Sequence, residues 1–258
     1  MKAYLINLDK DTHRLAFFRA NFNRLGIPFE RIAAVDGRVL SEDEYQQFMS
    51  KRPRNFNREK TKPWLRGQMG CFLSHYNVWK RIAEGRENYC AVFEDDIHVS
   101  DDLKHVLQSD TWIPRNTDII RLETSTNRVR LAQPLLKYKS RQLHPVKSTS
   151  WCAGAYIISR TTAQRLVALS EKYHEPADVM LYHFDESVIA RDLRILQFCP
   201  ALCTQDKHLA EGKVKFSSNI EFDTGSVAGI TSKIRRYSPL TLLTAIYRSC
   251  SGYRRIEF

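Results

Sequence analysis

The sequence predicts an α/β protein in which a mostly parallel sheet is flanked by helices. Short apolar segments typical of buried strands alternate with segments whose apolar side chains recur at helical spacing. The 258 residues include only 10 glycines and 9 prolines, which excludes a disordered or collagen-like chain. This length fits one large domain with a small appendage, which we place at 1–225 and 226–258.

Three strands and two helices are expected in the first half of the chain. The strand at 2–8 is apolar on both faces, as in a sheet covered from both sides. In the helix at 12–25, apolar side chains recur at i, i+3, i+7 and i+10, and Gly26 ends the pattern. The other expected elements are strands at 29–35 and 89–93 and a helix at 67–82.

The second half continues the alternation. Strands are expected at 117–122, 151–158 and 196–203, and a helix at 161–172, whose Ala163 and Leu166 face inward. Gly225, Ser226 and Gly229 indicate a linker, so the compact body ends near residue 225.

The positive charge is confined to two segments. The chain has 40 basic and 29 acidic residues, and the excess lies at 51–66 and 232–258. The first segment contains two prolines and little apolar periodicity, so we expect a mobile basic loop, either simply solvated or in contact with an anionic ligand. The second combines arginines with an apolar stripe over Leu240–Tyr247, which favours a basic amphipathic element on an anionic membrane, or else a last helix packed on the body.

The sequence indicates a cytoplasmic protein. No apolar run approaches the roughly 20 residues of a membrane span, and the apolar stretch at the N-terminus breaks too soon for a signal peptide. The six cysteines lack the paired spacing of a zinc ribbon, so we expect free thiols.

The strongest chemical signal is the run Glu94-Asp95-Asp96, which directly follows the apolar strand at 89–93. Open α/β sheets bind ligands outside the carboxyl ends of their strands. Carboxylate oxygens in this place suit Mg²⁺ or Mn²⁺, and such an ion can bridge a substrate's phosphates. The alternative is a turn of solvated acids, or the start of a helix before Asp101.

Weaker signals lie elsewhere. Gly70 precedes Ser74 and His75, which either face a ligand or belong to the core, and Gly154 marks a close approach or a bulge in a strand. Asp178 follows a proline turn and is either a helix N-cap or a general base, with Asp185 as a rival. His208 follows a strand and is a candidate to complete a metal site.

Several segments together carry a family resemblance over about residues 1–220. They are Tyr4-Leu5-Ile6-Asn7-Leu8-Asp9 with Arg14, Ala33-Ala34-Val35-Asp36-Gly37, Gly70-Cys71-Phe72-Leu73-Ser74-His75, Val92-Phe93-Glu94-Asp95-Asp96, Ala153-Gly154-Ala155-Tyr156-Ile157-Ile158-Ser159 and Pro176-Ala177-Asp178. The chain thereby resembles glycosyltransferase family 25, the bacterial lipopolysaccharide and lipooligosaccharide galactosyltransferases. The loop at 51–66 and the C-terminal segment lie outside this resemblance.

The resemblance implies a GT-A-type, Rossmann-like fold. With such an enzyme, the two basic segments predict a peripheral position on the inner face of the inner membrane, where they contact anionic lipid and the anionic acceptor core. The resemblance also implies inverting transfer of galactose from UDP-galactose, typically β-1,4, onto glucose or N-acetylglucosamine of lipooligosaccharide. Glu94-x-Asp96 takes the place of the D-x-D metal motif for Mn²⁺ (or Mg²⁺), with Asp95 near the ribose. The residues expected to contact the donor are Asn7, Arg14, Ser74, His75, Asp95 and Gly154. Asp178 is the first candidate base, Asp185 the second, and His208 a third metal ligand.

Three rival functions remain from the residues alone. A transferase that uses UDP-glucose or another nucleotide sugar is the nearest. A metal-dependent phosphohydrolase also needs acids at a strand end. A nucleic-acid-binding protein fits the sequence pI of about 9.4, but it leaves the acidic run unexplained, because carboxylates without a metal repel phosphates.

Overall fold

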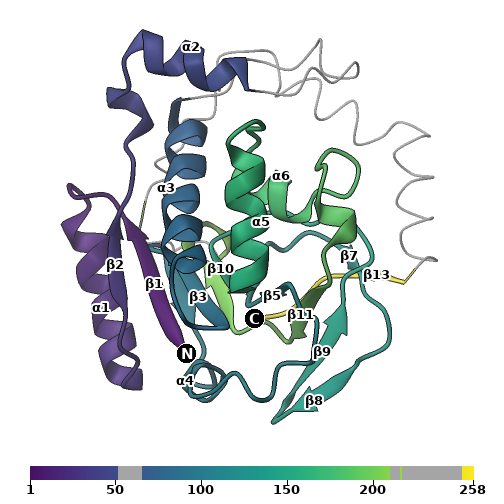
Figure 1. Cartoon of the computed structure of the whole chain (residues 1–258). Helices are drawn as coiled ribbons and strands as arrows, with labels where there is room; N and C mark the ends of the chain where they lie inside the picture. Colours follow the sequence, from purple (N-terminus) through teal and green to yellow (C-terminus); the bar gives the residue numbers. More distant parts are fainter. Residues whose placement is uncertain (52–65, 210–215, 217–251) are drawn as a thin grey trace, which may run out of the picture.

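An eight-stranded sheet forms the centre of the computed structural model, which describes residues 1–51, 66–209, 216 and 252–258 (Figure 1). Its strands are β1 (Lys2–Asn7), β2 (Glu30–Ala33), β3 (Tyr89–Glu94), β5 (Ile119–Arg121), β8 (Leu136–Tyr138), β9 (Arg141–Pro145), β10 (Ala155–Ser159) and β11 (Ile195–Cys199). They lie in the order β2-β1-β3-β10-β5-β11-β9-β8. β9 and β10 run antiparallel to the other strands, so the sheet is mixed but mostly parallel.

Helices cover both faces of the sheet, which confirms the predicted fold class. One face packs against α3 (Arg66–Ala83), α5 (Arg160–Ser170) and α6 (Ala177–Tyr182), and the other against α1 (Thr12–Leu25) and α4 (Leu103–Leu107) (Figure 1). Strand β1 shows the cause, because its side chains alternate between the two cores: Tyr4 and Ile6 lie in the first, Ala3 and Leu5 in the second.

Local signals in the sequence determine where several helices begin and end. Gly26 follows α1 with φ +67°, a left-handed conformation that glycine adopts without strain. Helix α2 (Glu42–Ser50), which we did not predict, begins with a capping box between Ser41 and Glu44. Phe18 and Phe22 of α1 pack on Phe93 of β3, which holds the helix against the sheet beside the acidic run.

Several predicted strands are shorter than expected: β2 covers only part of 29–35 and β5 only part of 117–122. Residues 151–154 form a loop, and β10 begins only at Ala155. The stretch at 196–203 divides into β11 and the start of β12 (Cys203–Gln205), because Pro200 has no N–H to donate to a sheet. β12 pairs with β4 (Ile97–Val99) and β6 (Glu123–Thr124) in a second, three-stranded sheet.

The last residues of the chain pack on the body. β13 (Tyr253–Arg254) pairs with β7 (Val129–Arg130), the Ala201 N–H donates to Glu257 O, and Ile256 is buried. The separate segment that we expected over 226–258 therefore does not extend to residues 252–258. The rest of that segment, 226–251, lies outside the described residues. The same holds for the predicted mobile loop at 51–66, of which only Lys51 and Arg66 are described.

The expectations on membrane-spanning helices and on the cysteines can be examined in the part of the chain that the structure describes. Within it, no helix combines the length and apolar character needed to cross a membrane. The five cysteines placed there, Cys71, Cys90, Cys152, Cys199 and Cys203, are free thiols as predicted.

Candidate active site

A cleft opens at the carboxyl ends of β1, β2 and β3. Asn7 ends β1, Ala34 follows β2 and Glu94 ends β3, and all three residues line the cleft. The cleft thus lies where the sequence placed the acidic run. It brings together seven of the predicted site residues: Asn7, Arg14, Ser74, His75, Glu94, Asp95 and Asp96.

Asp95 is held by two of the other predicted donor-binding residues. Its Oδ2 accepts a hydrogen bond of 2.7 Å from Asn7 Nδ2, and its Oδ1 pairs with Arg14 Nη1 at 2.9 Å. Burial raises the pKa of Asp95, although Asn7 and Arg14 act against the rise. Both carboxylate oxygens are therefore fixed in direction, which prepares the end of β3 to meet a ligand.

His75 is fully buried, and both ring nitrogens have partners. Trp79 Nε1 donates to the Tyr156 hydroxyl at 2.9 Å, and that hydroxyl lies 2.9 Å from His75 Nδ1. Since the ionised Glu94 carboxylate can only accept, Nε2–H donates to Glu94 Oε1 at 3.2 Å, and in the neutral imidazole Nδ1 then accepts from the Tyr156 hydroxyl. His75 therefore orients Glu94 at the wall of the cleft.

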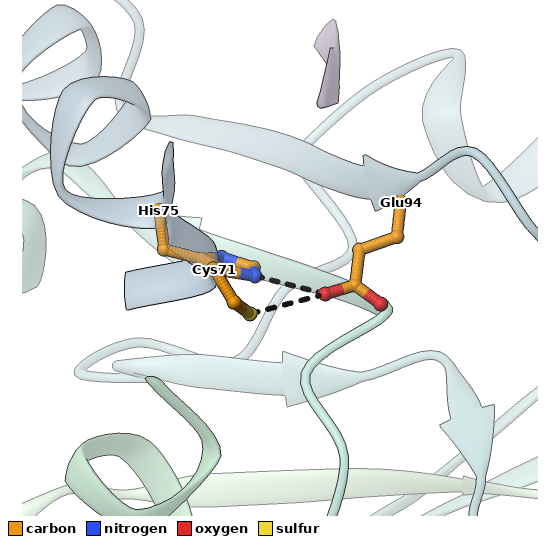
Figure 2. A group of neighbouring side chains, drawn as sticks. All are labelled: Cys71, His75 and Glu94. Carbon is orange, nitrogen blue, oxygen red and sulfur yellow. Dashed lines mark hydrogen bonds and ion pairs between the residues drawn. The ribbon is translucent and has the colours of Figure 1, made fainter. Parts of the chain in front are cut away.

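Glu94 also approaches a thiol. Cys71 and His75 lie one turn apart on α3 and, as Figure 2 shows, both side chains point to the Glu94 carboxylate. The ligand atoms of the three residues lie within 4.8 Å of one another. Nitrogen, sulfur and oxygen donors at this spacing suit Zn²⁺, whereas carboxylates alone suit Mg²⁺ or Mn²⁺.

The charges at the end of β3 favour a cation. Burial and the charge of Glu94 raise the pKa of Asp96 to about 7. Burial would also raise the pKa of Glu94, but the hydrogen bonds from His75 and Cys71 and the charge of Lys207 together outweigh burial, and the pKa is lowered. Gln205 Nε2 bridges the two carboxylates, at 2.8 Å from Glu94 Oε2 and 3.5 Å from Asp96 Oδ1. The carboxylates of Glu94 and Asp96 thus offer oxygen ligands, and a divalent cation bound between them would offset the repulsion between their negative charges.

Two predicted residues have structural contacts. Ser74 Oγ donates to Gly70 O at 2.6 Å and accepts from Val35 N at 2.9 Å, which ties α3 to the turn after β2. Gly154 does not line the cleft: its N–H donates to Glu123 Oε1 at 2.6 Å, and a Cβ there would lie 3.0 Å from Gln205 Nε2. The placement of Gly154 favours the close-approach role that the sequence left open.

Sequence reasoning missed Glu123, Gln205, Lys207 and Phe216. Glu123 is fully buried beside Gly154, and burial raises its pKa to about 8. Phe216 lines the cleft, with its ring 5.3 Å from the Arg14 guanidinium carbon. None of the four follows a motif, although the polar residues at the end of β12 repeat the pattern of acids that follow β3.

The three remaining candidates lie beyond the cleft wall. Asp178, at the start of α6, accepts a hydrogen bond from Cys152 N at 3.2 Å. His208 Nε2 lies 3.7 Å from Cys152 Sγ and is not among the residues that line the cleft. Asp185 is exposed and pairs with Arg191 Nη2 at 2.5 Å, in a second cavity. The structure therefore groups Glu94, Asp96 and all donor candidates except Gly154 in the cleft, and it leaves Gly154, His208 and the two candidate bases outside the cleft lining.

Comparison with known proteins identifies the relatives of this chain. The model of glycosyltransferase family 25 (LPS biosynthesis protein) matches residues 1–181. The lacto-N-neotetraose biosynthesis glycosyltransferase LgtE of Neisseria meningitidis serogroup B is 30% identical over 82% of this chain and 76% of its own length. LgtB of the same organism is 29% identical over 82% and 78%.

Solved glycosyltransferase structures are more distant. The galactosyltransferase LgtC, solved in complex with donor and acceptor sugar analogues, is 12% identical, with a TM-score of 0.37 over 76% of this chain and 73% of its own. A glycosyltransferase involved in glycosylation of the major capsid of PBCV-1 is 9% identical, with a TM-score of 0.41 over 81% of this chain and 93% of its own.

A mixed sheet with helices on both faces, and acids at the end of β3 in an open cleft, defines an α/β protein with a ligand site at its strand ends. The chain belongs to glycosyltransferase family 25, because the family model covers more than half of it.

Proposed function

We propose that this glycosyltransferase moves galactose from UDP-galactose onto a terminal glucose or N-acetylglucosamine of lipooligosaccharide, with inversion, in a β-1,4 linkage. The observation that carries the proposal is the cleft in which Asn7 and Arg14 hold Asp95 between Glu94 and Asp96. The names of the relatives LgtE and LgtB, which place those proteins in lacto-N-neotetraose biosynthesis, support the product class.

In this proposal the donor lies in the cleft. Arg14 is buried beside the acids, and Lys207 lines the same cleft, so the two cations balance part of the negative charge of a diphosphate. Glu94 and Asp96 hold Mn²⁺ or Mg²⁺, with Asp95 toward the ribose. When bound, the ion supplies Lewis-acid neutralisation of the leaving UDP.

Asp178 is our first choice for the base. The acceptor hydroxyl oxygen attacks C1 of the sugar, the bond from C1 to the phosphate oxygen breaks, and the electron pair leaves with UDP. The hydroxyl proton passes to Asp178, whose Oδ2 is held in place by Cys152 N. Asp185 stays second, since its carboxylate is exposed and already paired with Arg191. His208 stays a candidate third metal ligand.

Thermal unfolding with UDP, UDP-galactose and UDP-glucose, each with and without Mn²⁺, tests the donor site. A ligand that binds only the folded state, at 100 times its Kd, adds about 2.7 kcal/mol of stability. Stabilisation that needs both uridine nucleotide and Mn²⁺ is the expected result, strongest with UDP-galactose. A cooperative melt that no uridine nucleotide shifts would reject the donor, and a stronger response to UDP-glucose would change the sugar.

Mn²⁺ binding is expected to strengthen as the pH rises. The raised pKa of Asp96, about 7, means that at pH 6 a proton competes with the cation, whereas at pH 8 the carboxylate is ionised. Affinity should therefore increase by about tenfold between pH 6 and pH 8. Titration calorimetry in the presence of UDP measures this rise. An affinity that does not change with pH would show that Asp96 is not a ligand.

We further propose that the enzyme is cytoplasmic and binds the inner face of the inner membrane through the basic residues of 226–251. Replacing Arg235, Arg236 and Arg248 by glutamine should weaken co-sedimentation with phosphatidylglycerol vesicles by about 100-fold, since each basic residue near an anionic surface contributes about 1 kcal/mol. Arg254 is left in place because its Nη2 lies 3.1 Å from His144. Equal loss in a matched variant of the exposed residues Arg86, Lys104 and Lys172 would contradict a local effect.

A further inference from the structure

A second cavity is lined in part by Trp151. Its walls come from the segments 127–130, 147–151 and 183–191 and from Tyr253 in β13. Its volume is about 470 Å³, against about 130 Å³ for the cleft at the strand ends, so it is large enough for a small ligand. None of the predicted donor or metal residues lines it.

The lining of this cavity is basic. It carries Arg128, Arg130, Lys147 and Arg191 against a single carboxylate, Asp185, which is already paired with Arg191. Arg130 and Lys147 are exposed and lie close together, because Arg130 Nη2 donates to Lys147 O at 3.3 Å. The exposed Arg130 and Lys147, with Asp185 as the one carboxylate among the described lining residues, suit a ligand with a phosphate or a carboxylate group.

Trp151 gives the same cavity an aromatic wall. Its side chain is 41% exposed, unusual for a residue of this size, and its ring lies 4.9 Å from the His183 ring. The loop beneath is fixed by the buried Arg121, which donates to Trp151 O at 2.8 Å and to Ser150 Oγ at 2.6 Å. A rigidly held, exposed indole with polar neighbours is a suitable surface for the apolar face of a sugar ring.

Asp178 contacts the loop that forms one wall of the second cavity: its Oδ2 accepts a hydrogen bond from the N–H of Cys152, next to Trp151. Burial and the charges of Glu94 and Asp178 raise the pKa of Cys71, which lines the cleft. The proposed base therefore adjoins the second cavity, as a base that deprotonates a bound acceptor hydroxyl must adjoin the acceptor.

We propose that the second cavity binds the acceptor saccharide, that Trp151 stacks on one of its rings, and that Arg130 and Lys147 hold an anionic group, phosphate or carboxylate, near the accepting sugar. This inference rests on the proposed function, because a bound saccharide is an acceptor only if the protein transfers a sugar to it. Binding of an anionic saccharide in this cavity can nevertheless be measured without catalysis.

Calorimetric titration with cellobiose, cellobiose 6-phosphate and cellobiouronic acid provides neutral, phosphate and carboxylate probes. At least one anionic probe should bind about tenfold more tightly than cellobiose, and the stronger of the two identifies the group. The variant Arg130→Gln/Lys147→Gln should lose that advantage and keep the affinity for cellobiose, whereas Trp151→Ala should weaken all three by about tenfold. Equal affinity for all three probes would overturn the anionic site.

Two controls separate this inference from the proposed function. The variant Arg86→Gln/Lys104→Gln removes the same charge at exposed positions outside the cavity and should bind like the wild type. A matching loss there would overturn a local role for Arg130 and Lys147. The thermal shift with UDP and Mn²⁺ should be equal in the wild type, in Arg130→Gln/Lys147→Gln and in Arg86→Gln/Lys104→Gln. Should that shift be absent from all of them while the anionic probe still binds, the donor assignment fails and the saccharide site stands.

Discussion

Replacing Asp96 by asparagine is expected to abolish galactosyl transfer and to remove the joint stabilisation by UDP and Mn²⁺. Asparagine keeps the size of the side chain but provides no negative charge, so Glu94 is left as the one ionised ligand of the proposed pair. Loss of groups that merely orient metal ligands costs about 10- to 100-fold, so loss of a direct ligand should lower kcat/KM by at least about 100-fold. Steady-state transfer assays measure the change.

The same variant should fold at least as well as the wild type. Burial and the charge of Glu94 raise the pKa of Asp96, which means that the ionised carboxylate is unfavourable in the folded protein without a cation. Above pH 7, Asp96→Asn removes this repulsion and should melt at or above the wild-type temperature. Asp101→Asn is a matched control, since Asp101 is exposed and pairs with Arg24. Full activity of Asp96→Asn would contradict the metal site.

Replacing Gly70 by alanine should cause a large loss of stability, because α3 packs closely on the turn that lines the cleft. A Cβ at Gly70 would lie 2.4 Å from Val35 O and 2.5 Å from Gly37 N, distances shorter than any real contact. Both atoms belong to backbone, so the turn after β2 must move away from α3. Overpacking of this kind costs about 1–3 kcal/mol, which lowers the melting temperature of a chain this size by roughly 2–12 °C.

The displacement should also weaken donor binding. Residues 34–38 line the cleft beside Asn7, and their position depends on the hydrogen bond from Val35 N to Ser74 Oγ. Gly85→Ala is the control, because the nearest atom to its new Cβ would be Ile82 O at 3.2 Å, and its cost should stay below about 1 kcal/mol. If Gly70→Ala melts like Gly85→Ala, the close packing of α3 on this turn is not important for stability.

The acidic run shows what strand pattern alone can locate. The apolar segment at 89–93 ends in Glu94, Asp95 and Asp96, and strand ends of one direction meet at one edge of a sheet. That rule placed the acidic run at a ligand-binding edge of the sheet. Asn7 and Arg14 were added only by the family resemblance, and the structure places both against Asp95, directly after β3.

His75 and Gly154 show where the pattern was insufficient. A histidine on the apolar face of a helix fits both a ligand contact and a buried hydrogen-bonded position, and only the packing of Tyr156 and Trp79 against it selects the second. A glycine beside a strand likewise allows several kinds of close approach. The approach at Gly154 involves Glu123 and Gln205, which lie 31 and 51 residues away in the sequence and share no motif with it.

The sequence by itself determined the α/β class, the main helices and strands, the family resemblance and the place of the acidic run, because these depend on the local period of apolar residues and on short motifs. Only the tertiary structure decided which polar groups meet: the chain from Trp79 to Glu94, the buried Glu123, the basic cavity beside Trp151 and the return of residues 252–258 to the body. These contacts join residues far apart in the chain, and their partners are selected by packing and desolvation, which leave no periodic signal in a single sequence.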